Sequence, residues 1–146
     1  MIPLDEIRAA AATIAGEAVV TPVLRTDELD WLAGTRVLAK DESRQRTGSF
    51  KFRGAFNRVS AIPLDERHLG VVAVSSGNHG AAVACAAEIL GIEATVHVPA
   101  DVAPAKRALI EGFGARIVTF DRATPDREAA ARLQVATTGA TFVHPF

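Results

Sequence analysis

The chain has 146 residues, of which 49% are hydrophobic and 23% charged, and its formal net charge is −1. This balance is typical of a globular domain with a real core and excludes a disordered chain. Near-neutral charge, 5% aromatic residues and the absence of Tyr argue against nucleic acid or an anionic membrane surface as a partner. One cysteine, no signal peptide at the start and no apolar run of membrane-spanning length predict a cytoplasmic protein without disulfides.

The first part of the chain predicts two helices, a strand and a third helix. Residues 4–19 are Ala-rich with acidic residues at the start, and residues 26–33 precede Gly34, a typical helix stop. Residues 35–40 are predicted as a strand and residues 43–49 as a polar loop. A helix over 51–61 follows, with Thr47 or Ser49 as its cap.

From Gly70 onward, short apolar runs alternate with helical segments. The strands are predicted over 71–74, 94–98, 116–120 and 141–143, and the helices over 79–90, 104–111 and 125–136, the last capped by Thr124. This alternation predicts the α/β class, with a parallel four-stranded sheet and helices on both faces. A charged turn around 63–69 divides the chain into 1–68 and 69–146.

Lys51 lies at the opening of a predicted helix, in the sequence Thr-Gly-Ser-Phe-Lys-Phe-Arg-Gly-Ala over 47–55. The positive end of a helix disfavours a protonated amine, which helps a lysine act as a nucleophile toward an aldehyde. Phe50 beside it offers a flat apolar face to a ring. On spacing alone, a surface lysine in a first helical turn is the simpler interpretation.

A second motif, Ser75-Ser76-Gly77-Asn78-His79-Gly80, leaves a predicted buried strand and enters a helix. Free backbone N–H groups at such a place bind anions, and glycine lets a ligand approach the backbone. The alternative is that Ser or Asn merely caps the helix. Ligands of open α/β sheets bind at the carboxyl ends of strands, which favours a ligand site. The histidines and the single cysteine have no metal-ligand spacing, so no metal site is predicted.

In this order and at this distance, the two motifs resemble the lysine motif and the following loop of serine/threonine dehydratases and serine racemases. These are fold-type II pyridoxal-phosphate (PLP) enzymes, and the resemblance covers nearly the whole chain. It implies a fold similar to the β subunit of tryptophan synthase, in which 1–68 opens a large PLP-binding domain and 69–146 forms a small one. It also implies an ammonia-lyase that converts a small hydroxyamino acid, such as serine, threonine or hydroxyaspartate, to a 2-oxo acid and ammonia.

The resemblance implies roles for single residues. Lys51 would form the Schiff base with PLP and later move the Cα proton, Phe50 would lie against the pyridine ring, and Asn78 would hydrogen-bond the phenolic oxygen of the ring. The electron sink for a carbanion at Cα would be the ring itself. The residues implied to hold the substrate carboxylate are Ser75, Gly77 and His79.

Two positions distinguish between activities of the family. His79 favours dehydratases and racemases, since the similar cysteine synthases usually have threonine there. Ser76 occupies a position where many threonine dehydratases have alanine and serine racemases have serine. Its hydroxyl would be a second catalytic group that reprotonates Cα from the face opposite Lys51. A capping role for Ser76 is the alternative.

Family members are much longer, and their glycine-rich loop for the cofactor phosphate lies beyond residue 146. The chain also stops just after a predicted strand begins, so we expect a fragment. Three hypotheses stay open: part of an active dehydratase, part of a racemase, or a truncated non-catalytic α/β module that binds a small anion or a partner. The family also implies a homo-oligomer.

Overall fold

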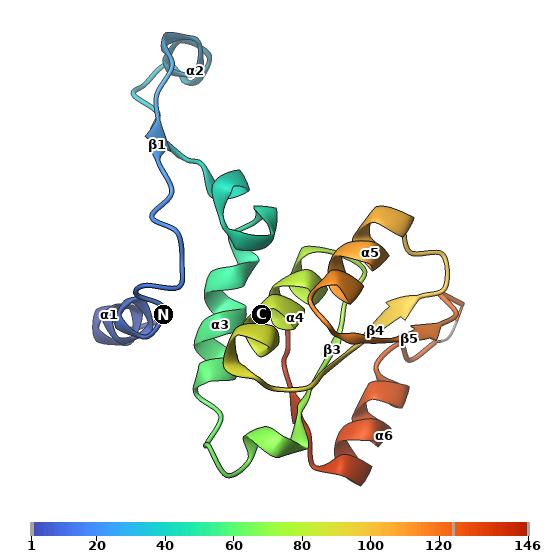
Figure 1. The fold of residues 1–146 in the computed structure, drawn as a ribbon. Coiled ribbons are helices and arrows are strands. Elements are labelled where there is room, and N and C mark those ends of the chain that lie inside the picture. The colour runs from blue at the N-terminus through green and yellow to red at the C-terminus, as the bar shows by residue number, and fades with distance from the viewer. Residues whose placement is uncertain (1, 124, 146) are drawn as a thin grey trace.

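The computed structural model describes residues 2–123 and 125–145, and a parallel sheet lies at the centre of this part of the chain (Figure 1). Its strands stand in the order β5-β4-β3-β6. Their bounds are Val71–Val74 for β3, Ala94–Pro99 for β4, Arg116–Phe120 for β5 and Thr141–Phe142 for β6. The predicted α/β class and the parallel four-stranded sheet are confirmed.

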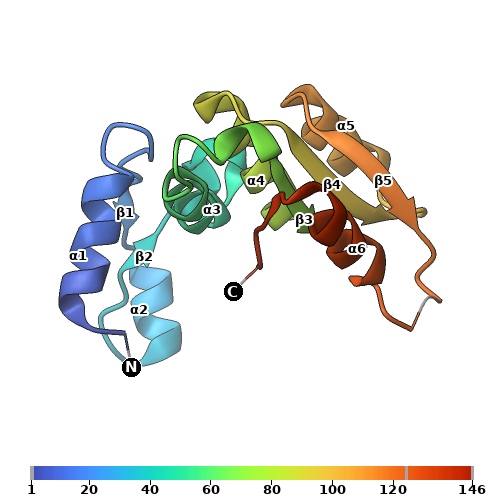
Figure 2. The ribbon, with the colours of Figure 1, turned by 90° about the horizontal axis from the view of Figure 1, so that it is seen from below.

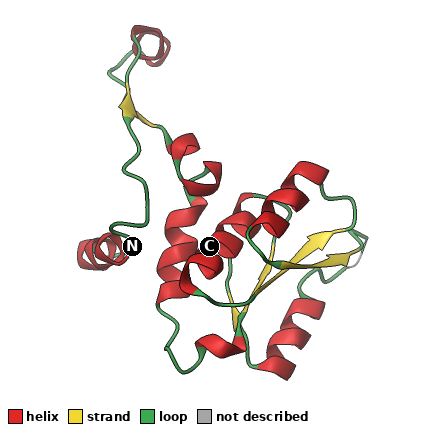
Figure 3. Cartoon of the chain, viewed as in Figure 1, coloured by secondary structure: helices red, strands yellow, loops and turns green. Residues whose placement is uncertain are grey.

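Helices cover both faces of this sheet, as predicted (Figures 1 and 3). On one face lie α4 (Asn78–Leu90) and α5 (Pro104–Gly112), and on the other lies α6 (Ala129–Thr138). Each face buries its own apolar cluster. The cluster beneath α6 is small and contains Val72, Ala131 and Ala140, whereas the cluster around α4 is the main core.

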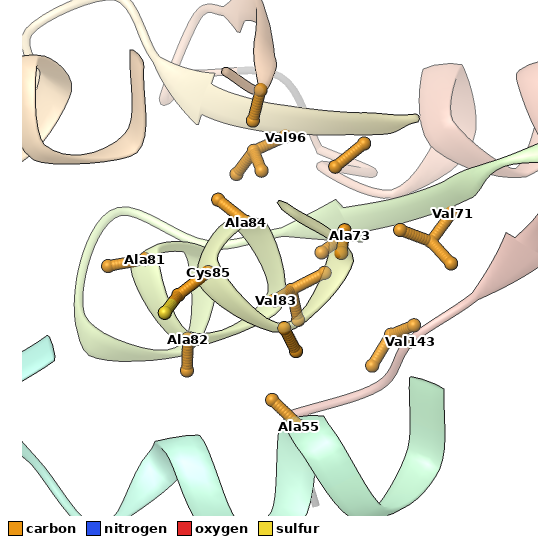
Figure 4. Packing of buried hydrophobic residues seen from close by; sticks show 14 of the residues in the cluster. Ala55, Val71, Ala73, Ala81, Ala82, Val83, Ala84, Cys85, Val96 and Val143 are labelled. Carbon is orange, nitrogen blue, oxygen red and sulfur yellow. The ribbon is translucent and has the colours of Figure 1, made fainter. Parts of the chain in front are cut away.

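The main core is built around α4, whose residues from His79 to Ala87 are all buried. A helix that is apolar all round must be enclosed on every side. Here the sheet covers one side, and α3 (Lys51–Ser60) covers another with a stripe of buried side chains (Figure 4). That stripe consists of Phe52, Ala55, Phe56 and Val59.

Gly80 permits the close approach of α4 to the sheet. A Cβ at this position would lie 2.9 Å from Val96 Cγ1 and 3.2 Å from the backbone oxygen of Ser75. Neither distance leaves room for a methyl group without movement of the helix. The first turn of α4 therefore lies directly on β4 because residue 80 has no side chain.

The amino-terminal part stands apart from the sheet, and its helix α3 packs on α4 (Figure 2). It contains α1 (Leu4–Thr13), α2 (Asp27–Ala33) and a short antiparallel pair, β1 (Val23–Leu24) and β2 (Ala39–Lys40). The helix predicted over 4–19 ends at Thr13, because the chain turns through Gly16 at φ 85°. The strand predicted over 35–40 is reduced to two residues, since its partner β1 is only two residues long.

The loop before α3 also differs from the prediction. It contains two short 3-10 turns, η1 (Glu42–Arg44) and η2 (Arg46–Gly48). The prediction that Thr47 or Ser49 caps α3 is wrong, because the helix has no side-chain cap. The chain turns sharply at Thr47 and Gly48, at φ 65° and 71°, and the Thr47 and Ser49 hydroxyls are buried without a hydrogen-bond partner among the described residues.

The start of α6 lies four residues later than predicted. Asp126 Oδ1 accepts a hydrogen bond from the Glu128 N–H, which holds this stretch in a turn. The predicted cap, Thr124, lies outside the described residues. The remaining predicted elements match within two residues at each end, and β3 and β5 match residue for residue.

A buried polar contact fixes α6 to β4. His97 is 2% exposed, and its Nε2 lies 2.8 Å from Gln134 Oε1. An amide oxygen only accepts, so Nε2 donates this bond. Gln134 Nε2 in turn donates to Thr95 Oγ1 at 3.2 Å. His97 is therefore a packed strand residue that orients the helix above it.

Candidate functional site

Lys51 is the first residue of α3 and points toward the described carboxyl end of the chain. Its Nζ donates a hydrogen bond of 2.6 Å to the Pro145 carbonyl oxygen, across 94 residues of sequence. The same ammonium group lies 5.3 Å from the centroid of the Phe50 ring. The predicted lysine and its aromatic neighbour are thus brought together with the segment that follows β6.

The second motif forms the loop from β3 into α4. The Ser75 N–H donates to the His97 carbonyl oxygen at 3.0 Å, and Ser75 Oγ accepts from the Gly77 N–H at 3.2 Å. No side chain caps α4. Within the described residues, the N–H groups of Asn78, His79 and Gly80 have no acceptor. They form the positive end of a 13-residue helix.

His79 is buried, and its imidazole forms a hydrogen bond with the backbone. Its Nε2 lies 2.9 Å from the Val143 carbonyl oxygen, which can only accept, so Nε2 carries the proton. Burial lowers the pKa of His79 below its ordinary value, and the positive charge of Lys51 also lowers it, although the Val143 carbonyl opposes the shift. The neutral imidazole links the loop to the segment after β6.

A cavity of about 380 Å³ lies between α3, the start of α4 and the segment after β6. Its lining residues are Phe50, Lys51, Arg53, Gly54, Ala55, Arg58, His79, Val143, His144 and Pro145. Every ionisable side chain in this wall is basic, so the cavity suits an anionic ligand. Of the predicted site residues, it brings together Phe50, Lys51 and His79. The remaining predicted site residues do not line the cavity. They lie just before His79 in the chain and are Ser75, Ser76, Gly77 and Asn78.

A larger cavity of about 670 Å³ lies at the opposite end of the sheet, where β3 and β4 begin. None of the predicted site residues lines it. Open α/β sheets bind their ligands at the carboxyl ends of strands, which is the end where Lys51 and His79 meet. The smaller cavity is therefore the candidate site.

An ion pair that the sequence motifs did not predict fixes α3 behind Lys51. The Arg53 guanidinium donates to both carboxylate oxygens of Glu42, at 2.7 and 2.9 Å, and Thr21 Oγ1 donates to Glu42 at 2.6 Å. The hydrogen bonds from Arg53 have the largest effect on the pKa of Glu42, and together with the contact from Thr21 they lower it to about 2. The residues are far apart in sequence, so no local pattern marks them as a group.

Neither a membrane span nor a metal cluster is found in the described part of the chain. No helix there is long and apolar enough to cross a bilayer. Across residues 2–123 and 125–145, no three His, Cys, Asp or Glu side chains gather in a way that could hold a metal ion.

Comparison with known proteins gives a consistent result. A family model described as "Pyridoxal-phosphate dependent enzyme" matches residues 14–146. L-threo-3-hydroxyaspartate ammonia-lyase of a Pseudomonas species is 45% identical over 134 residues, which are 92% of this chain and 42% of the relative. L-threonine ammonia-lyase of Thermotoga maritima is 40% identical over 150 residues, covering 100% of this chain and 36% of the relative.

The structure of maize serine racemase superimposes with a TM-score of 0.92 at 37% identity, over 97% of this chain and 43% of that one. The chain thus spans about two fifths of the length of the curated relatives it matches.

Proposed function

This chain belongs to the family of pyridoxal-phosphate-dependent enzymes, and we propose that the protein containing it is an ammonia-lyase for small hydroxyamino acids. The reaction would convert the substrate to a 2-oxo acid and ammonia. The observation that carries the proposal is the position of Lys51, at the start of α3 and on the wall of a basic cavity. Relatives named for hydroxyaspartate and threonine ammonia-lyase activity support the reaction class.

The residues of the cavity fit PLP. Phe50, Ala55 and Val143 give the wall apolar surface suited to a flat ring, beside the Lys51 amine. Gly54 also lines the wall, and apart from its own helix backbone and its chain neighbours no atom lies within 4 Å of the position that a Cβ would take there, so the space stays open. A volume of about 380 Å³ lies within the usual range for small-molecule pockets.

Lys51 would hold the cofactor through its amine and later move the proton at the substrate Cα. To do so, its Nζ must leave the Pro145 carbonyl oxygen, with which it now forms a hydrogen bond. When bound, PLP supplies an electron sink for the charge that develops at Cα. Asn78, the first residue of α4, would hydrogen-bond the phenolic oxygen of the cofactor.

The loop before α4 would hold the substrate carboxylate. His79 would bind the carboxylate through its backbone N–H, which is free, because its imidazole already forms a hydrogen bond with Val143. Ser75 and Gly77 would shape the loop through the hydrogen bond between them. Oriented N–H groups at a helix start stabilise a carboxylate without any side-chain charge.

Racemisation is a second candidate function, and one observation favours it. Ser76 is exposed and forms no hydrogen bond with any described residue, and α4 has no side-chain cap. A hydroxyl that is not used for capping is free to move a proton at Cα. An assay of the protein containing this chain with L-serine distinguishes the two reactions. A 2-oxo acid is the product of the lyase, and D-serine is the product of the racemase.

The first experiment tests the chain itself. We would add PLP to the purified chain, record the visible spectrum, reduce with borohydride and locate the added mass by peptide mass spectrometry. We expect a visible band and a label on Lys51, both absent in Lys51→Ala. The matched control is Lys40→Ala, because Lys40 lies outside the cavity and bonds to Thr21 and Glu42.

A folded chain without a band or label, checked by circular dichroism, would favour the non-catalytic module over a cofactor site in this part of the protein. A label on other lysines in equal amount would contradict the assignment of Lys51.

A further inference from the structure

We infer that Lys106 is a substrate-binding residue of this site, whose ammonium group completes the carboxylate-binding loop at the start of α4. The inference rests on the proposed function, which supplies an amino-acid substrate. It adds a residue from α5, a helix that carries none of the predicted site residues.

The position of Lys106 is the first argument. It is the third residue of α5, and its Nζ lies 3.6 Å from the place that a Cβ on Gly77 would take. Ile110, one turn further along, contacts the Cβ position of Gly80 at 3.3 Å. The first turns of α5 therefore lie against the loop, and the ammonium group is directly beside it.

The charge around Lys106 is the second argument. A cation in the first turn of a helix is disfavoured by the helix dipole. Lys106 nevertheless forms no hydrogen bond or ion pair with any residue in 2–123 or 125–145. The next residue, Arg107, is paired with Glu111 at 2.9 Å, and Asp101 is paired with Arg122 at 2.7 Å. A bound anion would supply the missing negative charge.

The free N–H groups beside it are the third argument. Asn78, His79 and Gly80 present unpaired donors at the positive end of α4, where an anion is stabilised. The ammonium of Lys106 approaches residue 77, which directly precedes these donors in the chain. Together they form a receptor with one full charge and several directed hydrogen bonds, which matches a carboxylate.

The two lysines of the site flank the same loop. Lys51 shares the cavity wall with His79, whereas Lys106 approaches Gly77 and does not line that cavity. An amino acid that bridges the loop would turn its amino group toward Lys51 and its carboxylate toward Lys106. Lys106 would thus set the orientation of the substrate, and it would leave the chemistry at Cα to Lys51.

Titration of the 15N-labelled chain with sodium propanoate, followed by NMR of the amide signals of residues 78–80, tests the inference without the cofactor. Lys106→Gln should weaken propanoate binding about tenfold, because a hydrogen bond to a charged group is lost. Lys106→Arg should stay within about threefold of the wild type. Arg107→Gln is the matched control, with the same loss of charge one residue along the same helix.

The holoenzyme of the protein containing this chain supplies the second readout. Lys106→Gln should raise KM for the hydroxyamino acid about tenfold or more, with kcat within a few-fold and the visible band of the lysine-bound cofactor unchanged. A structural role for Lys106 would instead lower the denaturation midpoint and change that band.

Equal behaviour of Lys106→Gln and Arg107→Gln in both experiments would overturn the inference and leave the proposed function intact. A holoenzyme that shows neither the band nor a product would refute the proposed function. In that case the propanoate titration alone decides whether Lys106 belongs to an anion site.

Discussion

Glu42 connects three segments through one carboxylate. It bonds to Arg53 on α3 and to Thr21 after α1, and the Arg53 guanidinium also donates to the Val19 carbonyl oxygen at 3.0 Å. These contacts hold the helix that begins with Lys51 against the amino-terminal part. Since they stabilise the charged form, the pKa of Glu42 is lowered to about 2.

A lowered carboxyl pKa makes stability depend on pH in one direction. The contribution of Glu42 is fully present above its ordinary pKa of 4.5 and is lost as the pH falls toward 2. We expect the free energy of unfolding to fall by roughly 1–2 kcal/mol from this group between pH 6 and pH 2.5. Urea unfolding at both pH values measures it.

Glu42→Gln should remove this part of the pH dependence and destabilise the chain at pH 6. Glu111→Gln, which disrupts an exposed ion pair on α5, serves as control and should change little at either pH. The same loss of stability between the two pH values in the wild type and in Glu42→Gln would contradict the assignment.

At the scale of elements, α4 connects the core to the site. Its small residues allow α3 on one side and the sheet on the other to approach closely, which brings Lys51 and His79 to one cavity. The approach is closest at Gly80, where a Cβ would meet Val96. The positions of the two motif regions therefore depend on the small side chains of α4, which let neighbouring elements approach closely.

Gly80→Ala should destabilise the chain by about 1–3 kcal/mol, because the new methyl group overpacks against Val96 and the Ser75 backbone. The urea denaturation midpoint measures this loss. Gly112→Ala is the control, since nothing lies within 4 Å of its Cβ position, and it should be neutral or slightly stabilising. Equal stability of Gly80→Ala and the wild type would show that α4 can move away from β4 without cost.

At the scale of the whole molecule, the amino-terminal part exposes much apolar surface. Trp31 is 80% exposed and Val20 is 94% exposed. Other exposed apolar side chains of this part include Ile2, Leu4, Ile7, Val23, Leu24, Leu29, Leu32 and Leu38. Contiguous exposed apolar surface is typical of sites where proteins associate. The division into 1–68 and 69–146 stays a prediction, and α3 from the first part packs on α4 of the second.

We expect the chain to self-associate in a concentration-dependent manner, because apolar side chains in this part remain in contact with water. Sedimentation velocity over a range of concentrations measures it. The double variant Trp31→Ser, Leu32→Gln should reduce association. The control is Leu133→Gln, which changes a similarly exposed leucine on α6 and should not reduce association. A monomer at every concentration would contradict the expectation.

The sequence by itself determined the α/β class, the bounds of most elements after Gly70 and the family. The strand over 71–74 was predicted residue for residue, because a strand buried between helices is a continuous apolar run. The strand over 116–120 also matches, although it lies at the edge of the sheet, is only partly buried and contains Arg116 and Thr119. The resemblance of the two motifs to PLP enzymes was confirmed by the family match over residues 14–146.

Only the tertiary structure decided which distant groups meet. The contact of Lys51 with Pro145 spans 94 residues and that of His79 with Val143 spans 64. The strand order and the approach of Lys106 to Gly77 likewise have no signal in the local sequence. Periodicity and propensity depend on neighbours along the chain, whereas these contacts depend on how whole helices and strands pack in space.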